Sequence, residues 1–109
     1  MKKRFWMSYD LGIDGDYDGL YSALDSLNAV ECGDSTCSFE LDTGKKDLPA
    51  AVLAFVKKHA KLRTKDRLYL IWRKDNGSVT GRFIAGKRRR APWAGYAVQS
   101  LGETEDAGE

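Results

Sequence analysis

Apolar positions change their spacing several times along the chain, and each change predicts a new element. Residues 5–9 form a short aromatic-rich run that predicts a buried strand. From Asp16 onward the apolar residues recur every three or four positions, which is the pattern of one helix face. They are Tyr17, Leu20, Tyr21, Leu24 and Leu27. Asp16 is a suitable N-cap for this helix, and Asn28 is a suitable end.

The rest of the chain repeats this alternation of strand and helix. Residues 29–32 and 36–41 predict two strands joined by the turn at 33–35. Asp47 then caps a second helix, and Pro49 falls in its first turn. The apolar positions of this helix are Leu48, Ala51, Val52, Phe55 and Val56, with His59 in the same stripe.

A hairpin is expected after the second helix. Residues 67–73 are the strongest strand pattern in the chain, and 78–85 return as a further strand. Asn76-Gly77 between them is the preferred pair for a type I′ turn. Residues 92–98 are apolar again and predict either a last strand or a packed tail.

The order of these elements predicts an α+β fold, a ferredoxin-like βαββαβ arrangement with an added C-terminal β-hairpin strand and tail. Both helices are expected on one face of an antiparallel sheet. Residues 1–101 are expected to form a single domain, and 102–109 an acidic disordered tail. The residues expected to face the sheet are Tyr17, Leu20, Leu24, Val52, Phe55 and Val56.

Length and composition indicate how many domains the chain forms and in which compartment it is expected. A chain of 109 residues with 42% hydrophobic positions is typical of one compact domain. No apolar run approaches the 18 or so residues of a membrane span, so no membrane partner is expected. The two cysteines, Cys32 and Cys37, are too few for a disulfide framework and match no common zinc spacing. We therefore expect a cytoplasmic protein.

Charge is distributed unevenly along the chain, although the net charge is only +2. Residues 1–56 carry five bases and ten acids, residues 57–90 carry thirteen bases and two acids, and residues 91–109 carry four acids. A basic block of this kind is typical of a surface that meets phosphates or an acidic partner.

The most informative basic residues lie around the second half of the hairpin and adjoin an indole. They are Arg82, Lys87, Arg88, Arg89, Arg90 and the neighbouring Trp93. Cations neutralise phosphates, and an exposed indole can stack on a base, so the cluster predicts binding of RNA or DNA. Two alternatives stay open: a solvated loop with Trp93 buried, and a surface for an acidic protein partner.

Several segments resemble a known family. Residues 5–11, then Asp16-Tyr17 and residues 20–24, resemble the opening of the small CRISPR-associated spacer-acquisition family and its VapD-like and SinR-annotated bacterial relatives. Residues 65–70 and 93–96 are similar to segments of the last group. The resemblance implies a ferredoxin-like protomer, a homodimer, and either a metal-dependent nuclease or a non-catalytic nucleic-acid scaffold in bacterial defence.

The resemblance also implies a role for Asp10, which matches the aspartate that ends the first strand in this family. Two such carboxylates across a dimer axis could hold Mg²⁺ or Mn²⁺ and orient a water for phosphodiester attack. Asp10 is then both the catalytic and the metal-binding candidate of a metal-dependent endoribonuclease. In the alternative interpretation, Asp10 caps the turn after the strand and bonds to backbone amides.

Other polar groupings favour structural roles. Asp14, Asp16, Asp18 and Asp25 match most of a calcium-loop template, but the helical stripe runs straight through it, so an acid-rich helix start is favoured. Cys37 and Ser38 lie within a strand, and the single histidine, His59, lies on a helix, which is unfavourable for nucleophilic catalysis. Three hypotheses remain: a nucleic-acid-binding protein, a nuclease centred on Asp10, and a protein-interaction module of a toxin-antitoxin or phage-defence system.

Overall fold

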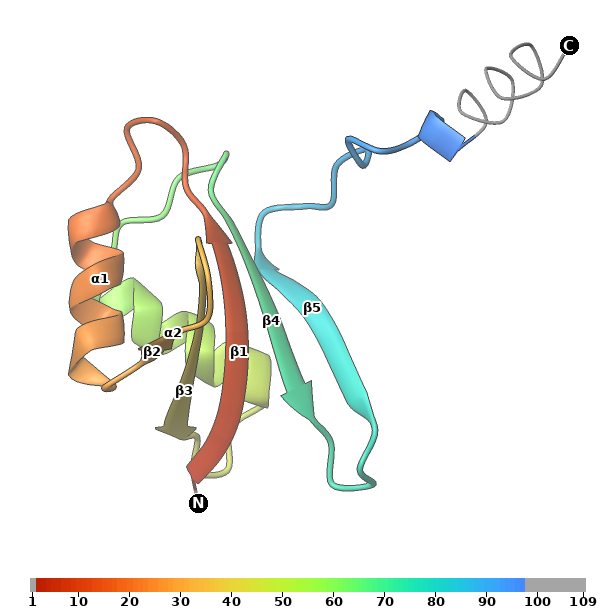
Figure 1. The fold of residues 1–109 in the computed structure, drawn as a ribbon. Coiled ribbons are helices and arrows are strands. Elements are labelled where there is room, and N and C mark those ends of the chain that lie inside the picture. The colour runs from red at the N-terminus through yellow and green to blue at the C-terminus, as the bar shows by residue number, and fades with distance from the viewer. Residues whose placement is uncertain (1, 98–109) are drawn as a thin grey trace, which may run out of the picture.

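A computed structural model describes residues 2–97 and shows an α+β fold with two helices and a five-stranded antiparallel sheet. The elements follow one another as β1 (Lys2–Asp10), α1 (Tyr17–Ser26), β2 (Val30–Glu31), β3 (Thr36–Asp42), α2 (Leu48–His59), β4 (Arg67–Arg73) and β5 (Val79–Ala85) (Figure 1). The strands lie in the order β2-β3-β1-β4-β5, and every neighbouring pair is antiparallel. This arrangement is compatible with the expected ferredoxin-like fold.

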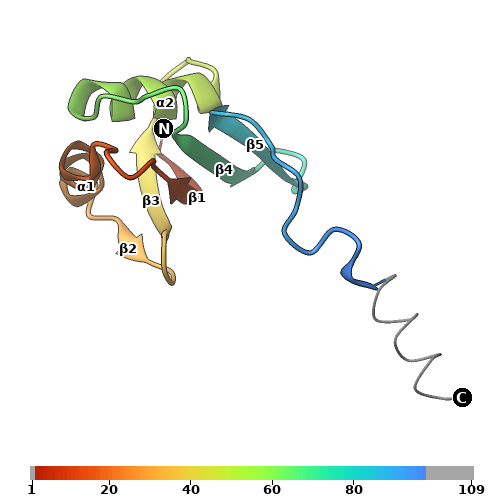
Figure 2. The same cartoon turned by 90° about the horizontal axis from the view of Figure 1, so that it is seen from above.

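Both helices lie on the same side of the sheet, and the segment after β5 runs on the other side (Figure 2). The helix side holds the core, in which Phe5, Met7, Leu20, Leu68 and Leu70 are completely buried. Of the six residues expected to face the sheet, Leu20, Leu24, Val52 and Val56 are buried, and Tyr17 packs against them. Phe55 instead lies half-buried outside this cluster, with its ring 5.0 Å from that of His59.

The predicted helix starts are confirmed, because each depends only on local sequence. Asp16 accepts a hydrogen bond from the backbone N–H of Gly19, and Asp47 accepts one from Ala50. Pro49 lies in the first turn of α2, where a missing N–H costs nothing. Asn28, the predicted end of the first helix, follows it in a left-handed conformation, with a φ of 53°.

Three local predictions need correction. The strand expected at 29–32 is reduced to Val30–Glu31, and residues 92–97 form turns and a short helical stretch instead of a strand. The turn after β4 is not type I′, which requires positive φ at two successive residues. Here Gly77 has a φ of 88° and Asn76 does not have a positive φ, while Gly77 N–H donates to the carbonyl of Lys74. These contacts, with the hydrogen bond from Lys74 N–H to the carbonyl of Ser78, indicate a three-residue loop in which Gly77 has a left-handed conformation.

Gly19 explains how the two helices come together. A Cβ at this position would lie 2.8 Å from Cα of Ala60 and would also clash with the carbonyl oxygen of His59. Gly19 is the third residue of α1, and glycine within a helix is less favourable than alanine by up to about 1 kcal/mol. That cost is accepted here because only glycine allows α1 to approach the end of α2 so closely.

No helix among residues 2–97 is long and apolar enough to cross a membrane. The expected acidic tail at 102–109 lies outside the described residues.

Candidate nucleic-acid interface

The sheet has one face covered by the helices and one open face, and alternate residues of each strand belong to each. Phe5 pairs with Trp72 and Met7 with Leu70 on the covered face. On the open face, Trp6 pairs with Ile71, Ser8 with Tyr69, and Asp10 with Arg67. The β4–β5 register adds Phe83 beside Tyr69. Residues far apart in the sequence thereby meet at the end of the open face where β1 finishes.

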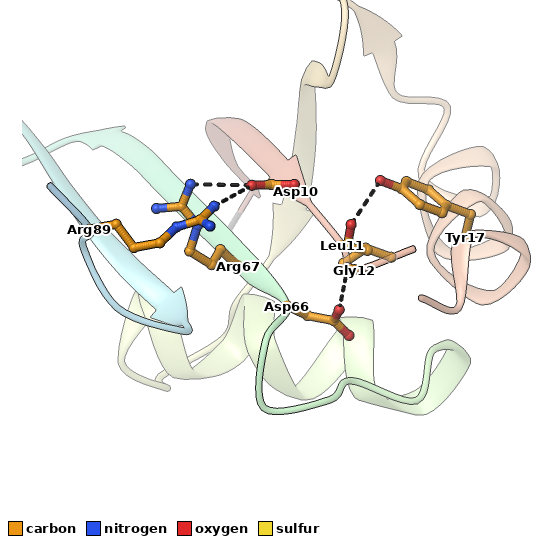
Figure 3. Close-up of polar contacts among 7 residues, drawn as sticks. All are labelled: Asp10, Leu11, Gly12, Tyr17, Asp66, Arg67 and Arg89. Carbon is orange, nitrogen blue, oxygen red and sulfur yellow. Dashed lines mark hydrogen bonds and ion pairs between the residues drawn. The ribbon is translucent and has the colours of Figure 1, made fainter. Parts of the chain in front are cut away.

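Asp10 pairs with two arginines at this end of the sheet (Figure 3). Its Oδ2 accepts a hydrogen bond from Arg67 Nη2 at 3.2 Å and from Arg89 Nη2 at 2.9 Å. The Asp10 side chain is 55% exposed, Arg89 67% and Arg67 24%. The ion pairs are therefore open to solvent and to competing anions.

Arg88 lies against two aromatic rings of the same face. Its guanidinium carbon is 5.6 Å from the ring centre of Tyr69 and 5.3 Å from that of Phe83, and the two rings are in edge contact at 4.8 Å. The guanidinium of Arg67 lies 5.5 Å from the same Phe83 ring. We call Arg67, Arg88, Arg89, Tyr69 and Phe83 the arginine–aromatic cluster.

Two glycines make this cluster sterically feasible. A Cβ on Gly81 would clash with the Tyr69 ring, so glycine lets that ring approach β5 closely. Gly86 has a φ of 75°, and a Cβ there would lie 2.6 Å from the carbonyl oxygen of Asp66. Gly86 thus turns the chain sharply after β5 and directs residues 87–90 back toward Asp10.

Two aspartates, Asp66 and Asp16, hold the loops beside the cluster by accepting hydrogen bonds from backbone N–H groups. Asp66, which is 1% exposed, accepts hydrogen bonds from the N–H groups of Gly12 and Arg63 at 2.9 and 2.7 Å. Asp16 accepts one from Lys61 N–H at 2.8 Å as well as the one from Gly19. These backbone donors, Lys61 first, lower the pKa of Asp16 below its ordinary value of 3.8. The loops after β1 and α2 are fixed to each other by these bonds.

The fixed loops border a cleft of about 620 Å³. Asp10 and Arg89 line one part of it, and Arg63, Thr64 and Lys65 line another. A second cleft, of about 510 Å³, lies between the arginine–aromatic cluster and Trp93. Cations therefore border both hollows that flank residues 87–90.

The structure places some of the residues predicted from the sequence in the arginine–aromatic cluster and others outside it. Arg88 and Arg89 belong to the cluster, and Lys87 and Arg90 are exposed beside them. Trp93 is 74% exposed, so the interpretation in which it is buried is wrong. Arg82 pairs with Leu70 in the sheet register and therefore lies on the opposite face from Phe83.

Four residues of the open face were missed by sequence reasoning: Trp6, Arg67, Tyr69 and Phe83. The available signal was the two-residue period of a strand, which places Arg67, Tyr69 and Ile71 on one face and Leu68, Leu70 and Trp72 on the other. Which of these faces is uncovered, and which strands lie beside it, depends on the sheet order.

The described residues do not fit a divalent ion at Asp10. Such ions require several oxygen ligands, and no three His, Cys, Asp or Glu side chains gather closely enough within residues 2–97 to hold one. Oδ2 of the carboxylate also pairs with two arginines, whose positive charges oppose a cation at the same oxygen. The metal role of Asp10 stays a prediction that would need ligands from a second chain.

The nucleophile candidates on β3 are both buried. Cys37 is 4% exposed, and burial raises the pKa of its thiol to about 11. Ser38 is also 4% exposed and donates its hydroxyl to the carbonyl of Phe5 at 2.9 Å. Neither group is available as an activated nucleophile, in agreement with their assignment as strand residues.

The site can thus be described chemically as a preorganised group of cations and aromatic rings with one internal counter-ion. Its geometry suits binding of an anion that presents flat rings nearby. Comparisons with protein-family models, with curated proteins and with solved structures found no match to this chain.

Proposed function

We propose that this protein binds nucleic acid through the arginine–aromatic cluster and the basic segment 87–90. The observation that carries the proposal is the convergence of Arg67, Arg88 and Arg89 on one end of the open sheet face. Guanidinium groups bind phosphate through paired N–H donors, and stacking on Tyr69 and Phe83 holds Arg88 in place before a ligand arrives.

Contacts of this kind recognise the backbone rather than the sequence. Arg88, Arg89 and Arg90 follow a strand end instead of projecting from a helix that could enter a groove. Phosphate contacts position a nucleic acid but carry no base information. We therefore propose binding to RNA and DNA with little sequence preference.

Asp10 acts in this proposal as a counter-ion that a phosphate replaces. Its Oδ2 occupies the same donors of Arg67 and Arg89 that a phosphate oxygen would use. Competition of this kind lowers affinity but keeps the two arginines oriented in the free protein. The alternative, a metal-dependent endoribonuclease, would use the same carboxylate as a ligand of Mg²⁺ or Mn²⁺ and needs it free of arginine.

The fold part of the proposal is a ferredoxin-like protomer. The order β2-β3-β1-β4, antiparallel throughout and with both helices on one side, supports it, with β5 added at the edge. A homodimer and membership of the spacer-acquisition and VapD-like group remain part of the proposal on the basis of the sequence resemblance. An acidic protein partner is the alternative occupant of segment 87–90.

The test measures binding of labelled RNA and DNA of unrelated sequence over a range of salt concentrations. Replacing Lys87, Arg88, Arg89 and Arg90 with Ala should reduce the slope of log affinity against log salt by about 0.7 to 0.9 for each phosphate that the variant no longer neutralises. The affinities for all sequences should fall by similar factors. Lys57→Gln with Lys58→Gln on α2 is the control, because it removes cations on the covered side of the sheet.

Binding equal to that of the parent at every salt concentration would refute the role of segment 87–90. Asp10→Asn then separates the binding and nuclease hypotheses, since it frees two arginines while keeping the side-chain shape. A counter-ion role predicts a few-fold gain in affinity at low salt. A nuclease role predicts instead that cleavage in Mg²⁺ or Mn²⁺, sensitive to EDTA, is lost in this variant.

A further inference from the structure

The open face of the sheet carries exposed apolar side chains along its length. Trp6 is 40% exposed although it lies on β1, the middle strand of the sheet. Val30 on β2 and Val79 on β5 belong to the same face and are 56% and 69% exposed. Exposed apolar surface bordered by polar groups is typical of an interaction site.

Arginines lie at both ends of this face. Arg67, Arg88 and Arg89 surround Asp10 at one end. At the other end, Arg4 precedes Trp6 by two residues on β1, and Arg73 follows Ile71 by two residues on β4. Since strands advance about 3.3 Å per residue, the two ends are about 20 Å apart.

A cleft lies beside each of the two groups of arginines. A cleft of about 310 Å³ is lined by Ser8, Tyr69 and Arg88, among others. A cleft of about 440 Å³ at the opposite end is lined in part by Arg4, Trp6 and Arg73. Trp6 therefore stands between two hollows that are each bordered by cations.

We propose that the open face binds a single strand of nucleic acid, which runs along β1 and β4 with an unpaired base stacked on Trp6 and its phosphates at the two arginine groups. The inference rests on the proposed function and adds the class of ligand and its path. Charge complementarity supports it, because a phosphate backbone meets cations at both ends of the path.

The central indole is the reason for favouring a single strand over a duplex. Base faces are hidden within a duplex, whereas an unpaired base can stack on an aromatic side chain whatever its identity. A duplex would use the arginines and gain nothing from Trp6. A second copy of the chain is disfavoured on this face because its arginines, Arg4, Arg67, Arg73, Arg88 and Arg89, outnumber the Asp10 and Glu40 carboxylates that pair with some of them.

The experiment compares short single-stranded oligonucleotides with duplexes of the same sequence, in RNA and in DNA. Trp6→Leu removes the ring and keeps an apolar side chain on the sheet. We expect it to weaken single-strand binding by about five- to 150-fold, the effect of losing one base stack, and to leave duplex binding unchanged. Trp6→Phe keeps a ring and should recover most of the affinity, which separates loss of stacking from loss of folding.

Charge at the far end provides a second readout. Arg73→Gln should reduce the salt slope for a single strand by about 0.7, and Lys58→Gln, with the same loss of charge on α2, should not. Parent-like single-strand binding by Trp6→Leu, together with loss of binding in the 87–90 variant, would overturn this path and leave the proposed function standing. No binding of any nucleic acid by the parent would overturn both.

Light scattering tests whether a second copy of the chain covers the open face. A parent dimer that Trp6→Leu converts to monomers would assign the open face to a second copy and refute the single-strand proposal. An unchanged oligomeric state in the two proteins, with weaker binding only in the variant, is the expected result.

Discussion

On β1 and β4, neighbouring residues face opposite sides of the sheet, and the two sides differ in burial and in charge. The covered side of these strands carries Phe5, Met7, Leu68 and Leu70, each with no exposed surface. The open side carries Arg4, Trp6, Ser8 and Asp10 on β1, and Arg67, Tyr69, Ile71 and Arg73 on β4. The same hydrogen-bonded ladder therefore supports a core on one side and a cationic, aromatic surface on the other.

This difference indicates that stability and binding can be changed separately. Substitutions on the covered side remove packing and should affect the free energy of unfolding. Substitutions on the open side change exposed groups and should affect ligand affinity. Substitutions on the two faces and the reactivity of a buried thiol test this separation of stability from binding.

The largest effect is expected from Phe5→Ala. Phe5 is completely buried and its ring lies 5.7 Å from that of Phe39, so the change leaves a cavity in the core. The free energy of unfolding should fall by about 3–5 kcal/mol, measured by urea denaturation. Ser8→Ala, on the open face of the same strand, should stay within about 0.5 kcal/mol of the parent. Equal losses in the two variants would contradict the separation of the faces.

A smaller loss is expected from Gly19→Ala, although alanine is the better helix former. The new Cβ would clash with Asp16, His59 and Ala60 where the start of α1 meets the end of α2. Overpacking of this kind should lower the free energy of unfolding by about 1–3 kcal/mol. Ser22→Ala, at an exposed position of the same helix, is the control and should be neutral or slightly stabilising. A stabilised Gly19→Ala variant would show that α1 and α2 are not held this close together.

The smallest change concerns thiol reactivity, which leaves the fold intact. Cys37 lies on the covered face, and burial raises the pKa of its thiol to about 11, so only about one molecule in a thousand is a thiolate at pH 8. Cys32 is exposed. A thiol reagent at pH 8 should therefore modify one cysteine quickly, and Cys32→Ser should abolish the fast phase. Two fast-reacting thiols in the native parent would mean that the covered face opens readily.

Sequence patterns were sufficient for features that depend on neighbouring residues. The N-caps at Asp16 and Asp47 are local hydrogen bonds, and β4 follows from an uninterrupted apolar and aromatic run. The basic block was visible from composition alone. The prediction of a type I′ turn was wrong because Asn-Gly occurs in more than one type of loop. The geometry of the flanking strands selects among these loops.

The candidate site depended on contacts that no local pattern contains. Asp10 is 57 positions from Arg67 and 79 from Arg89. It meets Arg67 because β1 lies beside β4 in one register, and it meets Arg89 because the chain turns back at Gly86 after β5. A shift of that register by one residue would move Arg67 to the covered face. Arg82 lies on the opposite side from its neighbour Phe83 because successive strand residues alternate between faces, and only the sheet order decides which of the two faces is open.

The sequence by itself determined the order of helices and strands, their caps and the basic character of residues 57–90, since these follow from the spacing of side chains along a local backbone. Only the tertiary structure decided which side of each strand stays open and which cations gather there. Gly86 illustrates the limit, because its left-handed turn directs Arg88 and Arg89 over the sheet. The physical reason is that pairing between distant strands fixes these positions, and pairing is a property of the whole sheet.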